Sequence, residues 1–184
     1  MELSDNGKRA LKIIFTDFLT SYNSYNIRGK LGLSGVGSLK LLRSLKEKNI
    51  LVSERMGNAI FYKPNLKSEY VVKLLELVFL DHHGLSNFVK GWVYDLRSFA
   101  HDTKAVFLFG SVLTKDKSAG DVDVCFILTS PKDYAKLQGG VGEMNKKNRL
   151  KIHPLYLTEK EFEKKLSEKD KPLVDMVRAC WLLV

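Results

Sequence analysis

The residues of this sequence best suited to chemistry are two aspartates, Asp121 and Asp123, on either side of Val122. In a strand, side chains alternate between two faces, so both carboxylates point the same way with their Cα atoms about 7 Å apart. Two carboxylates on one face suit a divalent cation, because Mg²⁺ prefers hard oxygen ligands and shares its coordination sphere with substrate phosphates. The pair therefore predicts a Mg²⁺ site.

A glycine–serine pair, Gly110-Ser111, ends an apolar run, and nine residues separate it from Asp121. A glycine at the end of a strand lets the backbone approach a phosphate, and a serine hydroxyl with neighbouring N–H groups can donate hydrogen bonds to it. Lys115 follows closely and carries a charge that would neutralise phosphate. We therefore predict that Gly110, Ser111 and Lys115 bind the phosphates of a nucleotide beside the metal.

The elements that must position these residues alternate between helix and strand. Apolar residues at helical spacing predict a helix over 85–100, and short apolar runs predict strands over 105–109, 122–128 and 150–157. The middle strand anchors its own acids, because alternate residues bury the opposite face: Val122, Val124, Phe126 and Leu128.

The connections between these strands are predicted from turn and capping residues. Ser130-Pro131 opens a helix to about Leu137, and a Gly-rich basic loop is expected over 139–148. Pro154 places the third strand at a sheet edge or a bulge. A capping box starts the next helix, with Thr158 as N-cap and Glu161 three residues later. Residues 171–183 are predicted as a final helix.

Over residues 85–166 the pattern resembles the nucleotidyltransferase superfamily that includes DNA polymerase beta, especially its minimal members. Gly110, Ser111, Asp121 and Asp123 match the motif of those proteins residue by residue. The resemblance implies that the acids hold Mg²⁺, with two ions in a complete site, and that Gly110-Ser111 grips the β and γ phosphates of a nucleoside triphosphate. An acceptor hydroxyl would then attack the α-phosphate and expel pyrophosphate.

The sequence departs from that family at the third acid, which active members place on the next strand. The strand 150–157 contains no acid, and the position in register is His153. A neutral imidazole can still orient or deprotonate the acceptor, so His153 joins Asp121 and Asp123 as a candidate catalytic residue. Whether the domain is an enzyme is left open. The plainer alternative is a surface turn followed by a strand with two solvated acids.

The first third of the chain carries most of the net charge of +9: residues 1–65 contain 11 Lys/Arg and 5 Asp/Glu. Such an excess favours a polyanionic partner. Helical periodicity over 7–20, a short helix near 27–31, a helix from Ser34 to about Lys48 and a hairpin around Gly57-Asn58 follow one another. Residues 27–62 resemble the winged-helix family, which implies a second helix in the major groove of double-stranded DNA and a hairpin on its backbone.

The resemblance places the DNA contacts on that helix and on the hairpin. The alternative for this domain is a helical module for protein contacts, and each cation alone is an ordinary solvated charge. The candidates are Ser38, Lys40, Leu41, Arg43 and Ser44 in the groove, with Arg55, Asn58 and Lys63 on the wing.

The whole chain is thus predicted as α+β, with an amino-terminal winged helix-turn-helix and a carboxyl-terminal nucleotidyltransferase-like α/β domain with a small mixed sheet. The expected boundaries are 1–65, 66–84 for a linker helix, and 85–184. The two cysteines, Cys125 and Cys180, are expected in the core of a strand and of the final helix, without a disulfide.

The expected function is a cytoplasmic DNA-binding regulator that binds, and in an active form transfers, a nucleotide. No stretch of the sequence is long and apolar enough to suggest a membrane. The apolar helix at 74–80 suits a homodimer seam. The alternative is an antitoxin-like enzyme that modifies a protein acceptor such as a toxin, or one that modifies small molecules, with the winged helix as an autoregulatory or docking surface.

Overall fold

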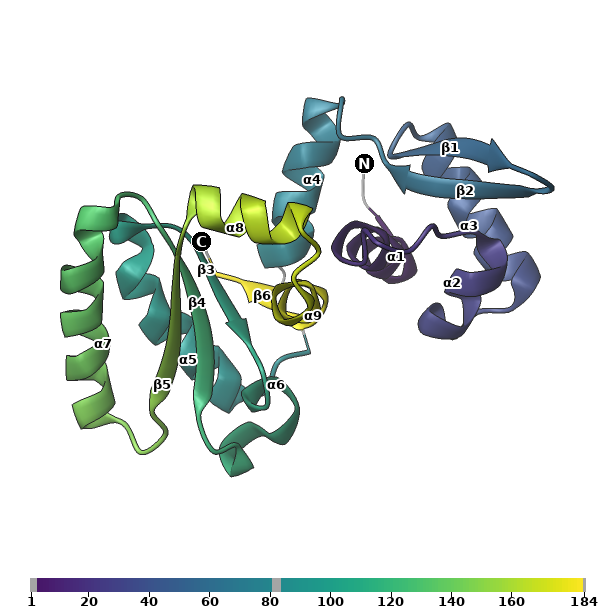
Figure 1. Ribbon diagram of the computed structural model, residues 1–184. Coiled ribbons are helices and arrows are strands. Elements are labelled where there is room, and N and C mark those ends of the chain that lie inside the picture. The colour runs from purple at the N-terminus through teal and green to yellow at the C-terminus, as the bar shows by residue number, and fades with distance from the viewer. Residues whose placement is uncertain (1–2, 81–83, 184) are drawn as a thin grey trace. The chain divides into compact units, whose positions relative to one another are not determined.

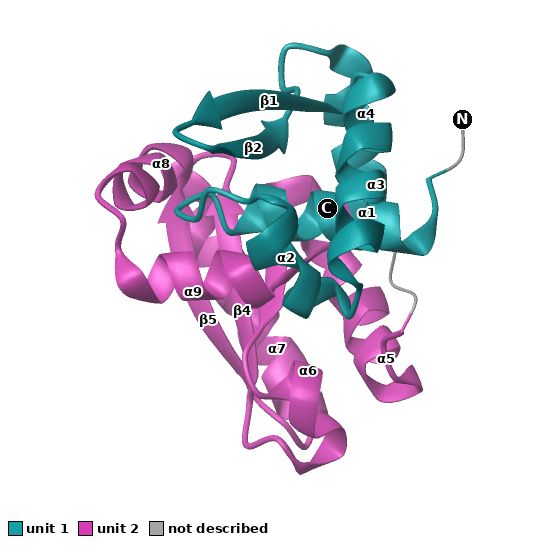
Figure 2. Ribbon diagram, turned by 90° about the vertical axis from the view of Figure 1, so that its right-hand side faces the viewer, with its two compact units in different colours: residues 1–78 teal, residues 79–184 magenta. Residues whose placement is uncertain are grey.

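The computed structural model describes residues 3–80 and 84–183, and the chain folds into two compact units, residues 1–78 and 79–184 (Figure 2). The sequence suggested a separate linker helix over 66–84. Most of that segment lies in the first unit as helix α4 (Glu69–Leu80), while residues 81–83 lie outside the described ranges. Within the described ranges, no helix combines the length and apolarity needed to cross a bilayer.

The first unit has the element order of a winged helix, as predicted. Three helices, α1 (Asp5–Thr16), α2 (Ser24–Leu31) and α3 (Gly35–Glu47), precede a hairpin of β1 (Leu51–Met56) and β2 (Ala59–Pro64) (Figure 1). The strands pair antiparallel around the Gly57-Asn58 turn, where Gly57 has a φ of 60°. The first helix ends at Thr16 rather than near residue 20, so its apolar spacing continues past the last helical turn.

Local chemistry explains where α2 and α3 begin and end. Asn23 and Asn26 form a capping box at the start of α2, and Gly32 ends the helix in the left-handed conformation with a φ of 68°. Ser34 caps α3 as predicted, accepting a hydrogen bond from the Gly37 N–H. One apolar residue from each helix is fully buried, so the three helices share a core: Leu11, Ile27 and Leu42.

The second unit is built on a four-stranded mixed sheet in the order β5-β4-β3-β6, which confirms the α+β class. Strand β4 pairs parallel with β5 and antiparallel with β3, which in turn pairs antiparallel with β6. Pro154 lies on the edge strand β5, where its missing N–H breaks no ladder. The strands are β3 (Thr103–Phe109), β4 (Val122–Leu128), β5 (Ile152–Thr158) and β6 (Trp181–Leu182). The α-helices are α5 (Asn87–Leu96), α6 (Val112–Lys115), α7 (Tyr134–Lys147), α8 (Glu159–Ser167) and α9 (Lys171–Ala179). Three short 3-10 helices connect them, η1 (Arg97–Asp102), η2 (Asp116–Ser118) and η3 (Pro131–Asp133).

Both faces of β4 are covered along most of its length. Its even-numbered residues pack in one cluster with α5 and α7, as the sequence predicted: Val122, Val124, Phe126 and Leu128. Cys125 and Ile127 face the other way and pack against Leu173 and Met176 of α9. Asp123 shares this second face by alternation, and it comes at the start of the strand. The sheet therefore holds the aspartate rigidly from behind.

The predicted Gly-rich loop over 139–148 is wrong, because α7 runs without a break from Tyr134 to Lys147. One of its glycines serves close packing: a Cβ on Gly140 would lie 2.8 Å from Cε1 of Phe99. The contact lets the helix approach the core, and it outweighs the low helix propensity of glycine.

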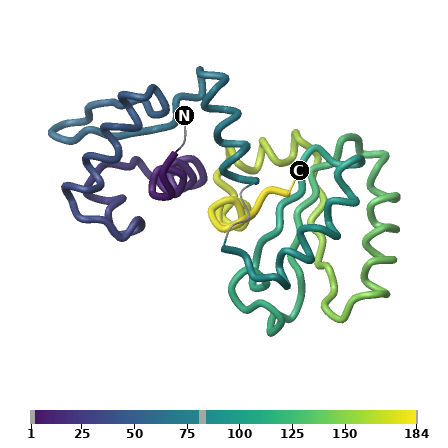
Figure 3. Tube along the Cα trace, turned by 180° about the vertical axis from the view of Figure 1, so that it is seen from behind, coloured from purple at the N-terminus to yellow at the C-terminus, as the bar shows by residue number. Residues whose placement is uncertain are grey.

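The predicted final helix over 171–183 is also wrong in its last part. Helix α9 ends at Ala179, and Trp181–Leu182 forms β6. Figure 3 shows this yellow carboxyl-terminal segment turning back along the sheet, where Leu182 pairs with Phe107 of β3. Cys180 therefore caps α9 instead of lying within it, and like Cys125 it is buried and not part of a disulfide.

Candidate metal and nucleotide site, and candidate DNA-binding surface

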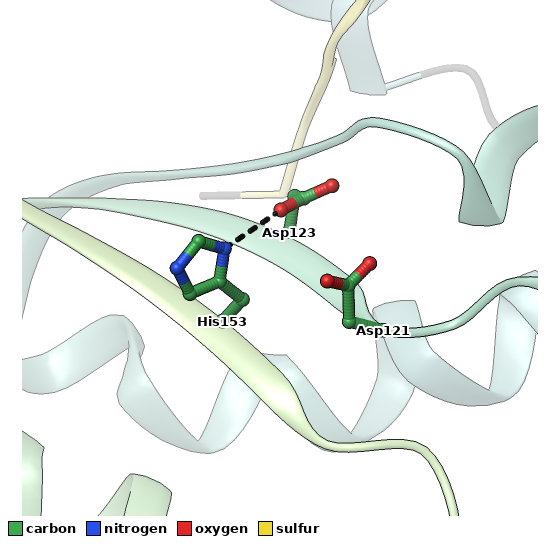
Figure 4. Close-up of side chains that lie close together, drawn as sticks. All are labelled: Asp121, Asp123 and His153. Atoms are coloured by element: carbon green, nitrogen blue, oxygen red, sulfur yellow. Dashed lines mark hydrogen bonds and ion pairs between the residues drawn. The ribbon is translucent and has the colours of Figure 1, made fainter.

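Asp121, Asp123 and His153 come together at the start of β4 and β5 (Figure 4). Each side chain offers one ligand atom, and these three atoms all lie within 4.8 Å of one another. Nδ1 of His153 lies 3.2 Å from Oδ1 of Asp123. The structure thus brings together the three groups that the sequence analysis singled out on two neighbouring strands.

The parallel register of β4 and β5 creates this meeting. Asp123 pairs directly with His153, so their side chains leave the sheet on the same side. The ladder begins just before, where the Val122 N–H donates to the Lys151 carbonyl at 2.9 Å. Because the next apolar residues of β4 are fully buried, a slip of one residue would expose the core and is strongly disfavoured.

Gly110 closes the site from the neighbouring strand β3. It has a φ of 79°, and Phe109 before it pairs with Asp123. A Cβ added to Gly110 would lie 2.0 Å from Oδ2 of Asp123. Only glycine allows the turn after β3 to approach the carboxylate this closely. The predicted Gly110-Ser111 turn is therefore directly beside the acids.

Ser111 and Lys115 lie on the chain that leaves this turn. Ser111 precedes the single turn α6, and its carbonyl accepts the Lys115 N–H at 2.8 Å. The side chain of Ser111 makes no capping hydrogen bond, and Lys115 is exposed. Both are thus placed near Gly110 by the chain itself, with side chains that remain available to a ligand.

The second unit also contains a cavity of about 460 Å³, which the sequence did not predict. It is lined by Trp92 and Asp95 of α5, by Lys117 and by the segment 148–150. Trp92 packs in the same cluster as Val122 and Val124, so this cavity is on the α5 side of the sheet. The acids face the α9 side, and the cavity is therefore separate from the metal cluster.

The candidate DNA-binding residues of the first unit divide by burial. Lys40 and Arg43 are exposed on α3, whereas Leu41 and Ser44 are half-buried. Ser38 is fully buried, and its hydroxyl donates to the carbonyls of Ser24 at 2.8 Å and Gly35 at 3.0 Å. The prediction that Ser38 faces the groove is wrong, because its hydroxyl joins α3 to α2.

The three wing candidates are all exposed around the hairpin. Asn58 is in the turn, and Nε of Arg55 donates to the Gly57 carbonyl at 3.2 Å. Lys63 pairs across the strands with Glu54 at 3.3 Å, which lowers the net positive charge of the wing at that point.

Sequence reasoning missed two exposed groups on the helices of the first unit. Val36 is 65% exposed and precedes Lys40 by one helical turn on α3. Tyr25 on α2 is 71% exposed, and the guanidinium of Arg28 is stacked 4.3 Å from the centre of its ring. The i, i+4 and i, i+3 spacings of these pairs are visible in the sequence, but their exposure is a property of the fold.

No family model and no curated protein match the chain. Among solved structures, a single-residue variant of ZitR from Lactococcus lactis matches with 17% identity and a TM-score of 0.38, over 53% of this chain and 62% of that one. The ZitR structure described as a zinc-responsive MarR family member matches with 15% identity and a TM-score of 0.36, over 55% of this chain and 76% of that one. This chain thus spans less than two thirds of the first of these proteins, and we draw no conclusion about function from such distant likenesses.

Proposed function

We propose that this protein is a DNA-binding regulator whose second unit binds a nucleoside triphosphate with a divalent metal ion. The observation that carries the nucleotide part is the cluster of Asp121, Asp123 and His153, whose ligand atoms lie within 4.8 Å of one another. The close approach of Gly110 to Asp123 supports it, because the glycine turn brings backbone N–H groups to the side of the metal where phosphates would lie.

In this proposal each residue has a limited and distinct task. Asp121 and Asp123 hold the metal, which would neutralise charge on the phosphates when bound. Gly110 and Ser111 donate to phosphate oxygens, and Lys115 adds positive charge. For transfer, an acceptor oxygen forms a bond to the α-phosphorus, the bond to pyrophosphate breaks, and the hydroxyl proton leaves to solvent or to a base at the site.

Nucleotide binding is tested by thermal shift with ATP and Mg²⁺ or Mn²⁺, comparing wild type with Asp121→Ala plus Asp123→Ala. We expect a metal-dependent stabilisation by ATP in the wild type and none in the double variant. A matched control, Glu163→Ala plus Asp175→Ala, removes two exposed acids from α8 and α9 and should behave as wild type. Equal stabilisation of all three proteins would contradict the proposal.

The DNA part of the proposal is supported by the exposed basic face of α3 in a helix–turn–helix followed by a hairpin. Lys40 and Arg43 lie three residues apart, one helical turn, and both are exposed. A helix of this kind enters the major groove with its exposed face toward the bases, while the hairpin contacts phosphates. The exposed hairpin cation Arg55 suits the second task.

DNA binding is tested by fluorescence anisotropy with a mixed-sequence duplex at several salt concentrations. Lys40→Glu plus Arg43→Glu should abolish binding, because two positive charges that attract the polyanion become two negative charges that repel it. The control, Lys160→Glu plus Lys164→Glu on α8, changes the net charge equally but in the second unit. If salt-sensitive affinity survives the α3 change and is lost in the control, the DNA surface lies in the second unit instead.

A homodimer through α4 is the assembly we propose for two-fold DNA sites. Tyr70, Leu77 and Leu80 are exposed apolar residues of this helix, and Leu77 is 66% exposed. Analytical ultracentrifugation should show a dimer for the wild type and a monomer for Leu77→Glu. A monomeric wild type at high concentration would exclude a dimer interface through α4.

The rival proposal is an enzyme that modifies a protein acceptor such as a toxin, with the first unit as a docking or autoregulatory surface. The pair of acids supports this enzyme as well as it supports the nucleotide-binding regulator, since both need the metal. Incubation of the protein with α-labelled ATP, metal and cell lysate separates them. Label transfer that requires Asp121 and Asp123 supports the enzyme, and binding without transfer supports the regulator.

A further inference from the structure

We propose that His153 is itself a metal ligand and that the Asp121–Asp123–His153 cluster therefore prefers Mn²⁺ to Mg²⁺. This inference rests on the proposed metal binding at the same site. It assigns to His153 a role different from that of a base for the acceptor.

The spacing of the three groups fits ligands of one ion. Two ligands at right angles on an ion, each at about 2.1 Å, are separated by roughly 3 Å, and two opposite ligands by roughly 4.2 Å. Nδ1 of His153 lies 3.2 Å from Oδ1 of Asp123, and no pair in the cluster exceeds 4.8 Å. The limit of 4.8 Å is only slightly above the span of opposite ligands, so the three atoms lie close to the spacing that a single ion requires.

The backbone beneath His153 is fixed by a clamp from α7. The Asn145 side chain accepts the Ile152 N–H at 2.6 Å and donates to the Ile152 carbonyl at 3.1 Å. Ile152 is buried and pairs with Val122, which fixes the following residue opposite Asp123. An edge strand usually frays at its first residue. Here the clamp fixes the backbone from which the imidazole extends toward the cluster.

The chemical types of the three ligand atoms then determine which metal ion is preferred. Mg²⁺ prefers an all-oxygen octahedron and keeps its water, whereas Mn²⁺ accepts an imidazole nitrogen among its ligands more readily than Mg²⁺ does. Replacing a third carboxylate by a neutral imidazole also lowers the ligand charge from three to two, which weakens the hard, strongly hydrated Mg²⁺ most. The exposed position of His153, whose side chain is 75% accessible, leaves the other coordination positions open to water or phosphate.

The test uses the metal alone and full-length protein, so it does not depend on activity. Mn²⁺ binding is followed by electron paramagnetic resonance, and pulsed measurements detect the nuclear coupling of a directly bound imidazole nitrogen. We expect this coupling in the wild type and in the control His101→Gln, which removes an exposed histidine of η1. His153→Gln should lose it and bind Mn²⁺ about tenfold more weakly.

His153→Asp is the decisive variant, because it supplies the third carboxylate. Competition between Mg²⁺ and Mn²⁺ should favour Mn²⁺ in the wild type, and the ratio of dissociation constants should move toward Mg²⁺ by about tenfold in His153→Asp. An unchanged ratio, or Mn²⁺ binding without nitrogen coupling, overturns the inference.

Failure of the proposed metal site and failure of His153 as a ligand give different experimental results. If Mn²⁺ binds and the binding is lost in Asp121→Ala plus Asp123→Ala, the proposed site stands whatever the histidine variants show. If that double variant binds Mn²⁺ like wild type, the proposed metal site and this inference both fail.

Discussion

The two units present their candidate residues in opposite ways. In the first unit the candidates are long cations on a helix surface, and no hydrogen bond or ion pair joins Lys40 or Arg43 to another side chain of the described ranges. In the second unit the candidate metal ligands are at the starts of two strands, where register places Asp123 opposite His153 and Gly110 lies against the Asp123 carboxylate.

This difference has a physical meaning for ligands. A flexible cation can follow a phosphate backbone whose position varies, and its contribution is mainly electrostatic and sensitive to salt. A metal ion demands ligands at fixed distances, so its site depends on the packing behind it. We therefore expect the second site to respond to changes in its scaffold, and the first to respond mainly to changes of charge.

The largest effect is expected from the core behind the acids. Phe126 is fully buried, edge-to-face with Phe99 and stacked on Tyr156, so Phe126→Ala should cost about 3–5 kcal/mol of the free energy of unfolding. Both tryptophans, Trp92 and Trp181, belong to the second unit, so their fluorescence reports its denaturant unfolding. DNA affinity, measured by anisotropy, should stay at its wild-type value.

The matching change in the first unit is Leu42→Ala, which empties a fully buried position of α3. It should cost about 2–5 kcal/mol there and weaken DNA binding, while the tryptophan transition stays in place. If both variants shift both observables together, the units unfold as one and the comparison between them fails.

The next largest effect separates two glycines with positive φ, one from each unit. Gly57 in the hairpin has nothing within 4 Å of an added Cβ, so Gly57→Ala should cost only the left-handed penalty of about 1–2 kcal/mol. Gly110→Ala carries the same kind of penalty and also forces Asp123 aside, since the added Cβ would lie 2.0 Å from its carboxylate.

We therefore expect Gly110→Ala to cost more than Gly57→Ala and to weaken Mn²⁺ binding, measured by electron paramagnetic resonance. Gly57→Ala serves as its control and should leave metal binding unchanged. Wild-type affinity in Gly110→Ala would show that the glycine turn does not help to shape the metal site.

A smaller effect is expected at Ser38. Its hydroxyl joins α3 to the start of α2 through the Ser24 carbonyl, so Ser38→Ala should cost about 0.5–1.5 kcal/mol. Because the side chain is buried, DNA affinity should stay unchanged when the unit is folded. Ser44→Ala, at a half-buried position of the same helix, is the matched control. A loss of DNA affinity in Ser38→Ala without a loss of stability would show that Ser38 contacts DNA in the major groove.

The sequence predicted best those features that depend on neighbours along the chain. The strand 122–128, the caps at Ser34 and Thr158, and the common face of the two aspartates follow from alternation and capping alone. The meeting of Asp123 with His153 also followed once the two strands were taken as parallel neighbours.

The predictions that failed depend on contacts between distant segments. Three glycines within residues 139–142 resemble a loop, and only the approach of Gly140 to Phe99 explains a helix there. The two-residue strand β6 exists because Leu182 pairs with β3, which no local pattern shows. Ser38 precedes the buried Leu42 by four residues and so lies on the buried face of α3, where its polar hydroxyl is accommodated because it donates to the Ser24 carbonyl.

The smallest expected effect concerns capping boxes, which the two units build with different chemistry. In α8 the N–H and hydroxyl of Thr158 donate to Glu161 at 2.8 Å and 2.7 Å, which lowers the pKa of that carboxyl below its ordinary value of 4.5. In α2 the corresponding residue is Asn26, which accepts the Asn23 N–H at 2.8 Å and carries no charge. Of these two capping boxes, the one in α8 is therefore the one that responds to pH.

Because the pKa of Glu161 is lower in the folded than in the unfolded chain, its stabilisation is present above about 4.5 and is lost as the pH falls through the folded value. Glu161→Gln should lower the Tm of the tryptophan transition slightly at neutral pH, and the difference from wild type should shrink in acid. Glu163→Gln on the same helix leaves the box intact and serves as control.

Asn26→Ala should destabilise the first unit equally at neutral and at acid pH, which the amide resonances of α2 report. A pH-dependent cost in Asn26→Ala, or a constant one in Glu161→Gln, would show that charge is not what distinguishes the two caps.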